Sequence, residues 1–391
     1  MLRQILAITL INLASIPRRW GPSLVIVVGI AGVVGVLISV LAMAHGFLDT
    51  MAHTGRADRA IVLRGGSNSE LASTLSRETT LVIADAPGVA KDADGHAIVS
   101  AEVVAIIDLP LRQGGTSANV TLRGVGPQAV ALRPELALIA GRWFQPGLRE
   151  MVVGRSAQQQ FSGIELGSRV AFRDADWTVV GVFASDDSHA SEVMADSEVV
   201  LGAYRRNLYQ SVTVLLQSAS LFDSFKTFLT SNPRLSVEVS RETDYYARLS
   251  ARLGKILTYV AYVVGGIMAV GALFGALNTM YSAVSARTVE IATLRAIGFA
   301  GTPILVSVFV ESLLLALLGA LIGAGLAWLF FNGNAVNTLS GNFTQVVFHL
   351  QVTPGLAILG ILWAAVIGLL GGLFPAMRAV RRPVVDALRG H

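Results

Sequence analysis

Residues 287–329 read RTVEIATLRAIGFAGTPILVSVFVESLLLALLGALIGAGLAWL, and this stretch decides the fold. It begins with charged and apolar side chains intermixed up to Gly298, which is a typical C-terminal stop for a short helix. Beyond that glycine, Glu311 is the single charged residue. A membrane helix requires about 20 apolar residues to cross about 30 Å of hydrocarbon. The stretch therefore predicts a short charged helix within residues 285–302 and a transmembrane helix at residues 303–331.

Long charge-free stretches recur elsewhere in the 391-residue chain. Asp, Glu, Lys and Arg are absent from residues 20–47, 256–286 and 312–377. Only 14% of all residues are charged, whereas about 25% is usual for a soluble domain. Residues 312–377 are long enough for two crossings, and Asn and Gly residues near 332–342 interrupt them where a turn is expected. We therefore predict a membrane protein with four transmembrane α-helices, at residues 22–46, 255–284, 303–331 and 356–376.

Two other interpretations fit the lengths of these segments less well. Buried helices of a soluble protein rarely extend this far without a charged residue. Residues 22–46 could also belong to a cleaved signal peptide, but the apolar region of a signal peptide spans only about 7–15 residues. Four membrane crossings are the simpler interpretation.

Lys and Arg near the helix ends predict the orientation, because cytoplasmic loops carry an excess of both. The excess lies at residues 1–21, 285–302 and 377–391, whereas the loop at 332–355 has neither residue type. We therefore place residues 1–21 in the cytoplasm as an interfacial helix and 377–391 as a cytoplasmic tail. Residues 47–254 and the outer loop would lie outside the cytoplasm. The net charge of +4 comes from residues beside the membrane, so it indicates no nucleic-acid partner.

Residues 47–254 are predicted to form a large extracytoplasmic α+β domain, inserted between the first and second transmembrane helices. Tyr246, Leu249 and Leu253 share one helical face, and so do Met43, Phe47 and Met51. Both transmembrane helices would then continue outward as stalks, although the spacing fits ordinary packing of helix ends equally well. Helices are also predicted at 156–161 and 220–231, and strands at 60–63, 98–107, 119–124, 151–153, 169–172, 177–183 and 211–216.

Several kinds of chemistry are excluded or disfavoured by the sequence. The chain has no Cys, so it has no disulfide or thiolate metal site. A Walker A loop requires Gly before its Lys, and Phe225 precedes Lys226, which is the one Lys followed by Ser or Thr. The run Asp186-Asp187-Ser188-His189 could bind a cation, but it is more typical of a solvated loop. We therefore predict no enzyme activity, no catalytic residue, no metal site and no cofactor bound by this chain.

The short charged helix within residues 285–302 has side chains suited to a surface contact. Arg287 and Glu290 are neighbours on the short helix, and Ile291 and Leu294 can face one way with Arg295 beside them. This helix could lie on lipid headgroups or contact a cytoplasmic partner.

Glu311 is about 12 Å deep in its helix, at about 1.5 Å per residue. A carboxyl group at this depth could make a polar contact that holds two helices together or couples their movement. It could equally be a hydrogen-bonded residue of ordinary helix packing. A proton relay is disfavoured because no second intramembrane acid or base accompanies it.

Glycines recur at a spacing of four residues in three of the predicted transmembrane helices. Such pairs allow helix backbones to approach closely, so they indicate tight packing or dimerisation. The pairs are Gly271 and Gly275, Gly319 and Gly323, and Gly368 and Gly372.

The chain resembles the MacB/FtsX-type permease family of ABC transporters, as a transmembrane subunit without a fused ATPase. That family shows an R-x-x-E-I-x-x-L-R-A-x-G run, then an apolar stretch with one Glu and a glycine-rich helix. Ala292 departs from the pattern, where Gly is frequent. The matching residues are Arg287, Glu290, Ile291, Leu294, Arg295, Ala296, Gly298, Glu311, Gly319 and Gly323. The tail PAMRAVRRPVVDALRG is similar to the family's closing motif at Pro375, Ala376, Ala379, Pro383, Ala387, Leu388 and Arg389. AGRWFQPGLREMVVG and LGSRVAFRDADWTVVGVFA, from the outer domain, also resemble the family.

The resemblance implies a multi-pass protein of the bacterial inner membrane that pairs with a second permease copy or a paralogue. It implies a separate cytoplasmic ABC ATPase, which binds ATP and Mg, and a coupling helix formed by residues 285–302. It implies that the stalks transmit ATPase closure to the outer domain and so drive export or extraction of lipids, lipoproteins, peptides or drugs. A periplasmic adaptor protein is a further candidate partner. The alternative is an FtsX-like signalling subunit that activates a cell-wall hydrolase without transport.

Overall fold

The computed structural model describes residue 9 and residues 20–112, 114–173, 175–339 and 344–381. The chain divides into two compact units. The helical unit comprises residues 1–45, 255–334 and 350–391, and the sheet unit comprises residues 46–254 and 335–349.

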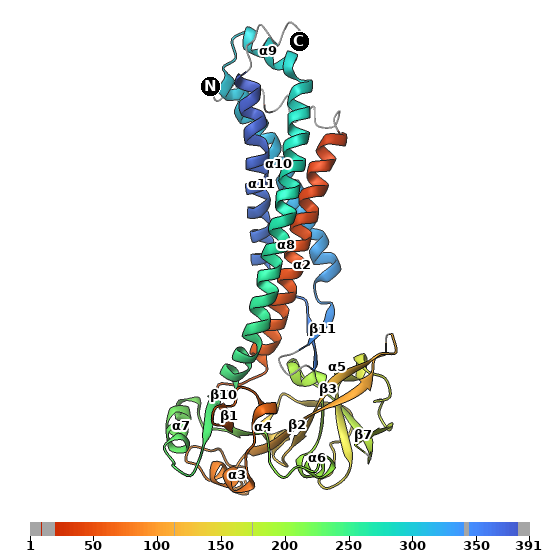
Figure 1. Cartoon of the computed structure of the whole chain (residues 1–391), viewed down its shortest axis with the longest axis vertical. Helices are drawn as coiled ribbons and strands as arrows, with labels where there is room; N and C mark the ends of the chain where they lie inside the picture. Colours follow the sequence, from red (N-terminus) through yellow and green to blue (C-terminus); the bar gives the residue numbers. More distant parts are fainter. Residues whose placement is uncertain (1–8, 10–19, 113, 174, 340–343, 382–391) are drawn as a thin grey trace. The chain divides into compact units, whose positions relative to one another are not determined.

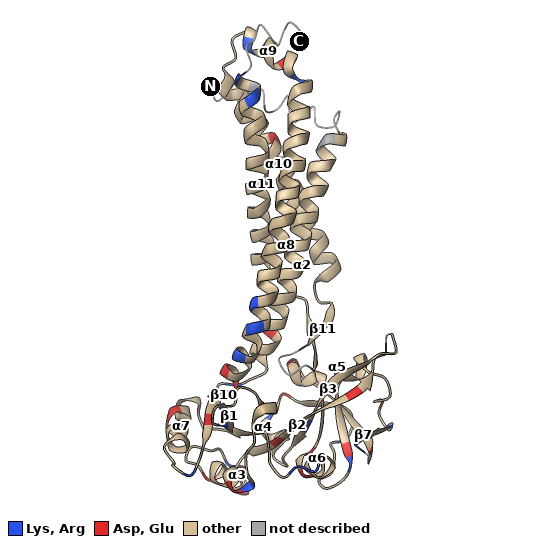
Figure 2. Ribbon diagram, viewed as in Figure 1, with Lys and Arg blue, Asp and Glu red and all other residues tan. Residues whose placement is uncertain are grey.

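Four helices of the described chain are long and apolar enough to cross a membrane. They are α2 (Trp20–His53), α8 (Glu242–Ala286), α10 (Gly301–Phe331) and α11 (Pro354–Arg381), and a short helix, α9 (Thr288–Ala296), precedes α10. The long helices run side by side in Figure 1. Figure 2 shows that their central sections carry almost no charged residues. The prediction of four transmembrane helices is therefore confirmed.

Two of the helices extend beyond the predicted spans. α2 continues to His53, and α8 already begins at Glu242, so the helical continuations predicted from residue spacing are present. The boundaries between the units fall within both helices. The predicted interfacial helix, residues 1–21, lies outside the described residues except for three positions, and so do Pro383, Leu388 and Arg389.

Glycines allow close backbone contact between three helices of the helical unit. A methyl group added at Gly319 would lie 2.8 Å from the Val27 carbonyl oxygen of α2, and one at Gly323 would overlap the backbone of Ala31. Gly368 and Gly372 of α11 pack against α10, where atoms of Ser312 and Ala316 lie beside them. Gly271 and Gly275 of α8 differ, because no atom from elsewhere in the described residues lies within 4 Å of an added methyl group there.

The sheet unit contains one ten-stranded mixed sheet in the order β10-β1-β9-β2-β3-β8-β5-β7-β4, with β6 paired to β7. Its strands are β1 (Arg59–Arg64), β2 (Val99–Pro110), β3 (Ser117–Val125), β4 (Ala137–Gly141), β5 (Glu150–Gly154), β6 (Arg169–Phe172), β7 (Ala175–Ala184), β8 (Glu192–Asp196), β9 (Ser211–Leu215) and β10 (Val237–Arg241). The helical elements are η2 (Glu70–Ala72), α3 (Arg77–Ala84), α4 (Ala129–Leu132), α5 (Arg155–Gln160), η3 (Ser188–Ser191), α6 (Ser197–Ala203), η4 (Ala219–Leu221) and α7 (Phe222–Thr230).

The two largest hydrophobic clusters among the described residues of this unit define two lobes of the sheet. In the first lobe, β1, β9 and β10 pack with α3 and α7 around residues such as Val214 and Phe225. In the second lobe, β3, β5, β7 and β8 pack with α5 and α6 around residues such as Trp177 and Phe161. The long strand β2 pairs with β9 and with β3, so it joins the two lobes.

The seven predicted strands are present, but five others were not predicted. They are β4, β8, β10 and the two strands of a hairpin, β11 (Ala335–Leu339) and β12 (Gln345–His349). All five residues of β8 are buried, so its sequence lacks the alternation that marks a strand with one exposed face. The hairpin lies within residues 332–355, which were predicted as an outer loop, and belongs to the sheet unit.

Candidate functional site

The short helix α9 ends as predicted. Gly298 has a φ of +100°, a left-handed conformation that glycine adopts without steric cost. The backbone N–H of Phe299 donates to the Leu294 carbonyl at 3.0 Å, and that of Ile297 donates to the Thr293 carbonyl at 3.1 Å. These bonds satisfy carbonyls of the last turn and terminate the helix before α10 begins.

Arg287 connects the start of α9 to the middle of the helical unit. Its Nε lies 3.3 Å from Glu290 Oε2, and its Nη1 lies 3.5 Å from Glu311 Oε2 of α10. The sequence indicated no second acid or base within the membrane spans beside Glu311, and its partner Arg287 comes from the segment between α8 and α9. Arg287 comes from another part of the chain, so sequence proximity within the third helix did not reveal it. The pairing reduces the free-energy cost of burying either charge alone.

Arg295 connects the other end of α9 to α11. Its Nη1 donates to the Val380 carbonyl at 3.0 Å, within the last turn of that helix. A cation is favourable at this place because the last carbonyls of a helix carry partial negative charge. The Val380 side chain also lies against Gly301, the first residue of α10. α9 is therefore attached to α10 through Arg287 and to α11 through Arg295.

The side chains of α9 divide between an inner and an outer face. Ile291 is buried, and it lines a small pocket with Leu294, Arg287 and Glu311. The opposite face exposes Val289 and Ile297, at 56% and 69%, with Thr293 exposed between them at a spacing of four residues. Val289, Thr293 and Ile297, called the outer face of α9 below, were not singled out from the sequence. Their i, i+4, i+8 spacing is the signal that could have identified them.

The sheet unit contains a buried network of charged residues that was not predicted. Arg123 of β3 forms ion pairs with Glu70 at 2.8 Å, Glu102 at 2.8 Å and Glu192 at 2.6 Å. Glu102 also pairs with Arg133 at 2.6 Å. Burial alone would raise the pKa of Glu102, but Arg133 and Arg123 together lower it to about 2. Glu102 therefore remains ionised, and the network connects strands of both lobes.

Glu242, the first residue of α8, belongs to the same network. Its Oε2 lies 2.6 Å from Arg59 Nε and accepts a hydrogen bond from the backbone N–H of Arg56 at 3.2 Å. Its Oε1 lies 3.8 Å from Arg133. Gly55 lies directly against the backbone of Glu242, where a side chain would collide. The start of α8 and the segment after α2 are therefore joined within the sheet unit.

Asp187, Ser188 and His189 are buried, whereas Asp186 is exposed, so the prediction of a solvated loop is wrong for three of the four residues. His189 is fully buried, and its Nδ1 lies 2.9 Å from Asp187 Oδ2. Burial alone would lower the pKa of His189, but the charge of Asp187 and its hydrogen bond raise that pKa above its usual value. The Asp187 pKa is correspondingly lowered, because His189 outweighs the effect of burial. Polar residues can be buried here because they are paired with each other.

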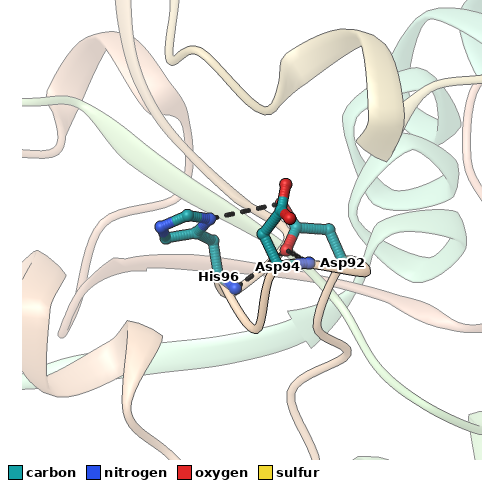
Figure 3. Close-up of side chains that lie close together, drawn as sticks. All are labelled: Asp92, Asp94 and His96. Atoms are coloured by element: carbon teal, nitrogen blue, oxygen red, sulfur yellow. Dashed lines mark hydrogen bonds and ion pairs between the residues drawn. The ribbon is translucent and has the colours of Figure 1, made fainter.

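Three potential metal ligands lie together in an exposed turn, as Figure 3 shows. They are Asp92, Asp94 and His96. Asp92 Oδ1 accepts hydrogen bonds from the backbone N–H groups of Asp94 and His96, and Oδ2 accepts one from Gln128. The turn accounts for the position of Asp92, and we assign no metal to this cluster.

Two family models match the chain. Residues 23–230 match the MacB-like periplasmic core domain, and residues 262–384 match the FtsX-like permease C-terminal region.

Curated relatives show similar sequences at low identity. The macrolide export ATP-binding/permease protein MacB of Pasteurella multocida is 26% identical over 308 residues, covering 71% of this chain and 44% of that protein. The uncharacterized ABC transporter permease YknZ of Bacillus subtilis is 24% identical over 216 residues, covering 54% of this chain and 52% of that protein. The chain thus spans about half the length of these relatives.

Two solved structures are similar to part of the chain. The extracellular domain of YknZ matches with a TM-score of 0.36 and 18% identity, over 47% of this chain and 100% of that one. The periplasmic region of MacB from Actinobacillus actinomycetemcomitans matches with a TM-score of 0.37 and 16% identity, over 49% of this chain and 92% of that one.

Proposed function

The chain belongs to the ABC transporter permease family that joins a MacB-like periplasmic core domain to an FtsX-like permease region, and from this premise we propose that it couples ATP hydrolysis by a separate ATPase to motion of that domain. It is a multi-pass protein of the bacterial inner membrane with an extracytoplasmic segment. The coupling, the partners and the cargo are the proposed parts of this function. ATP and Mg would be bound by the ATPase.

The geometry of α9 carries this proposal. Arg287 attaches it to α10, and Arg295 attaches it to α11. A displacement of α9 would therefore act on two long helices at once. Its outer face has two apolar side chains, Val289 and Ile297, that are more than half exposed. Exposed apolar residues on a well-anchored helix are suited to contact another protein. We assign the outer face of α9 to the ATPase.

A second permease subunit is proposed to bind along α8. This helix has large exposed apolar residues, including Ile267 and Phe274, and its Gly271 and Gly275 have no neighbouring atoms within the described chain. Small residues at this spacing permit close approach of another helix. The cargo is proposed to be a lipid, lipoprotein, peptide or drug that moves outward.

The outer face of α9 provides a direct test. The variants Val289→Asp and Ile297→Asp would place a charge in the contact, and Leu81→Asp is the matched control because Leu81 of α3 is 67% exposed in the sheet unit. The ATPase that co-purifies with the wild-type chain is quantified after affinity purification, together with its turnover in liposomes. We expect both α9 variants to lose most of the bound ATPase and the control to retain it. Equal recovery with all three variants would overturn the assignment.

A further inference from the structure

The short helix η3 lies where three segments of the sheet unit meet, and each segment continues along the chain into the helical unit. The backbone N–H of Ser188 donates to Thr54 Oγ1 at 3.1 Å, just after α2. The ring of His189 meets the ring of Tyr246, in the second turn of α8, edge to face at 6.1 Å. The backbone N–H of Val347 in β12 donates to Ser191 Oγ at 2.9 Å.

These contacts are shielded from solvent. Thr54 and His189 are fully buried, and Ser188, Ser191 and Tyr246 are at most 5% exposed. The hairpin is held further by an edge-to-face contact of Phe348 with Phe47 at 5.7 Å and by a 3.0 Å hydrogen bond between Thr121 and Thr344. Buried hydrogen bonds are costly to break without replacement. A displacement of these segments therefore has to move η3 or lose the bonds.

Hydrogen bonds between Asp187 and His189 hold the short helix η3 in its conformation. Asp187 Oδ1 accepts from the backbone N–H of His189 at 3.0 Å, and Oδ2 contacts His189 Nδ1. The backbone of η3 also lies directly against Gly154 at the end of β5, where any side chain would collide with Ala190. A displacement of η3 would therefore press on the second lobe.

The residue after η3 leads into the centre of the second lobe. Glu192 begins β8, which pairs with β3 on one side and β5 on the other. Glu192 is also the ion-pair partner of Arg123. The first lobe is attached through Arg59 of β1, which pairs directly with Glu242 of α8. The two lobes are therefore attached to the long helices at different places.

We infer that η3 is a positioning element that transmits movement of α2, α8 and the β11–β12 hairpin to the second lobe. This inference rests on the proposed function, because it requires that the periplasmic domain moves during the ATPase cycle. Loss of the η3 contacts then uncouples the second lobe while leaving the α9 contacts with the ATPase intact.

The test uses the full chain with its co-purified ATPase in nanodiscs. The chain has no Cys, so cysteines placed at Lys226 of α7 and Arg169 of β6 give one spin label on each lobe. The distance between labels is measured by pulsed electron resonance, without nucleotide and with vanadate-trapped ADP. The variant Thr54→Val/Ser191→Ala removes two η3 hydrogen bonds. Ser168→Ala is the control because the Ser168 hydroxyl donates to nearby carbonyls, those of Gly163 and Glu165. Ser191→Ala alone serves if the double variant does not elute as a folded complex.

We expect a nucleotide-dependent distance change in the wild type and control that falls by at least half in the η3 variants, with ATP turnover within twofold of wild type. An unchanged response in the η3 variants, or no response in the wild type, would overturn the role of η3. Failure of the ATPase to bind the chain at all would instead overturn the proposed function.

Discussion

Arg287 Nη1 lies 3.5 Å from Glu311 Oε2, and each of these side chains is only 9% exposed. The pair joins the residue that follows α8 to α10, across 24 positions of sequence. Glu290, which is largely exposed, contacts the same guanidinium from α9. One arginine therefore holds together the second long helix, the proposed coupling helix and the third long helix.

Removing one member of this pair is expected to be more harmful than removing both. Glu311→Gln leaves Arg287 buried with a weaker partner, and breaking a buried pair in this way costs about 3–5 kcal/mol. The double variant Arg287→Gln/Glu311→Gln should lose less than the sum of the single variants, because no buried charge remains. Thermal unfolding of the detergent-purified wild type, the two single variants and the double variant measures this double-mutant cycle. Simple additivity would show that the two side chains do not interact energetically.

A large residue at Gly323 is expected to disrupt the helical unit. The backbone of Ala31 lies where its side chain would be, so Gly323→Leu must separate α10 from α2. Gly325→Leu is the matched control, since no neighbouring atom among the described residues lies within 4 Å of an added methyl group there. The fraction of monodisperse protein after gel filtration should fall for the first variant and stay near wild type for the second. Equal yields would contradict the close contact between α2 and α10.

Gly275 of α8 is expected to behave differently from Gly323. An added methyl group meets no neighbour in the part of the chain that the structure describes, so Gly275→Leu should fold normally. If a second permease subunit binds along α8, the same variant should reduce dimer formation at least severalfold, because close helix contact depends on small residues. Disulfide cross-linking of a single cysteine at residue 278 in native membranes measures the dimer. Undiminished cross-linking in Gly275→Leu would place the interface elsewhere.

The His189–Asp187 pair is expected to stabilise the sheet unit more strongly at acidic pH. The folded-state pKa of His189 is raised above its unfolded value of 6.5, so its contribution is complete below that value. The contribution is lost as the pH rises through the raised pKa. Unfolding of the His189→Gln variant is compared with wild type at pH 5 and pH 9.

His96→Gln is the matched control for this comparison, because the His96 side chain is 73% exposed. We expect the stability difference between wild type and His189→Gln to shrink on raising the pH, and the control to show little difference at either pH. A difference that grows with pH would contradict the direction of the His189 pKa shift.

The four membrane helices, the end of α9 at Gly298 and most strands of the outer domain were predictable because each depends on residues close together in sequence. Charge-free length identifies a membrane span, and a glycine after a periodic run identifies a helix end. β8 was missed because burial on both faces removes the alternating pattern. The β11–β12 hairpin was missed because its strands are defined by pairing with each other.

The sequence by itself therefore determined that the chain spans a membrane with a large inserted domain, because only helices rich in apolar residues can satisfy their backbone groups in hydrocarbon. The tertiary structure alone decided which charges are buried and paired. Arg287 meets Glu311, and Asp187 with His189 enters the interior, because residues from several elements surround them. Local sequence does not encode such surroundings, since the free energy of a buried charge depends on partners that folding brings from elsewhere in the chain.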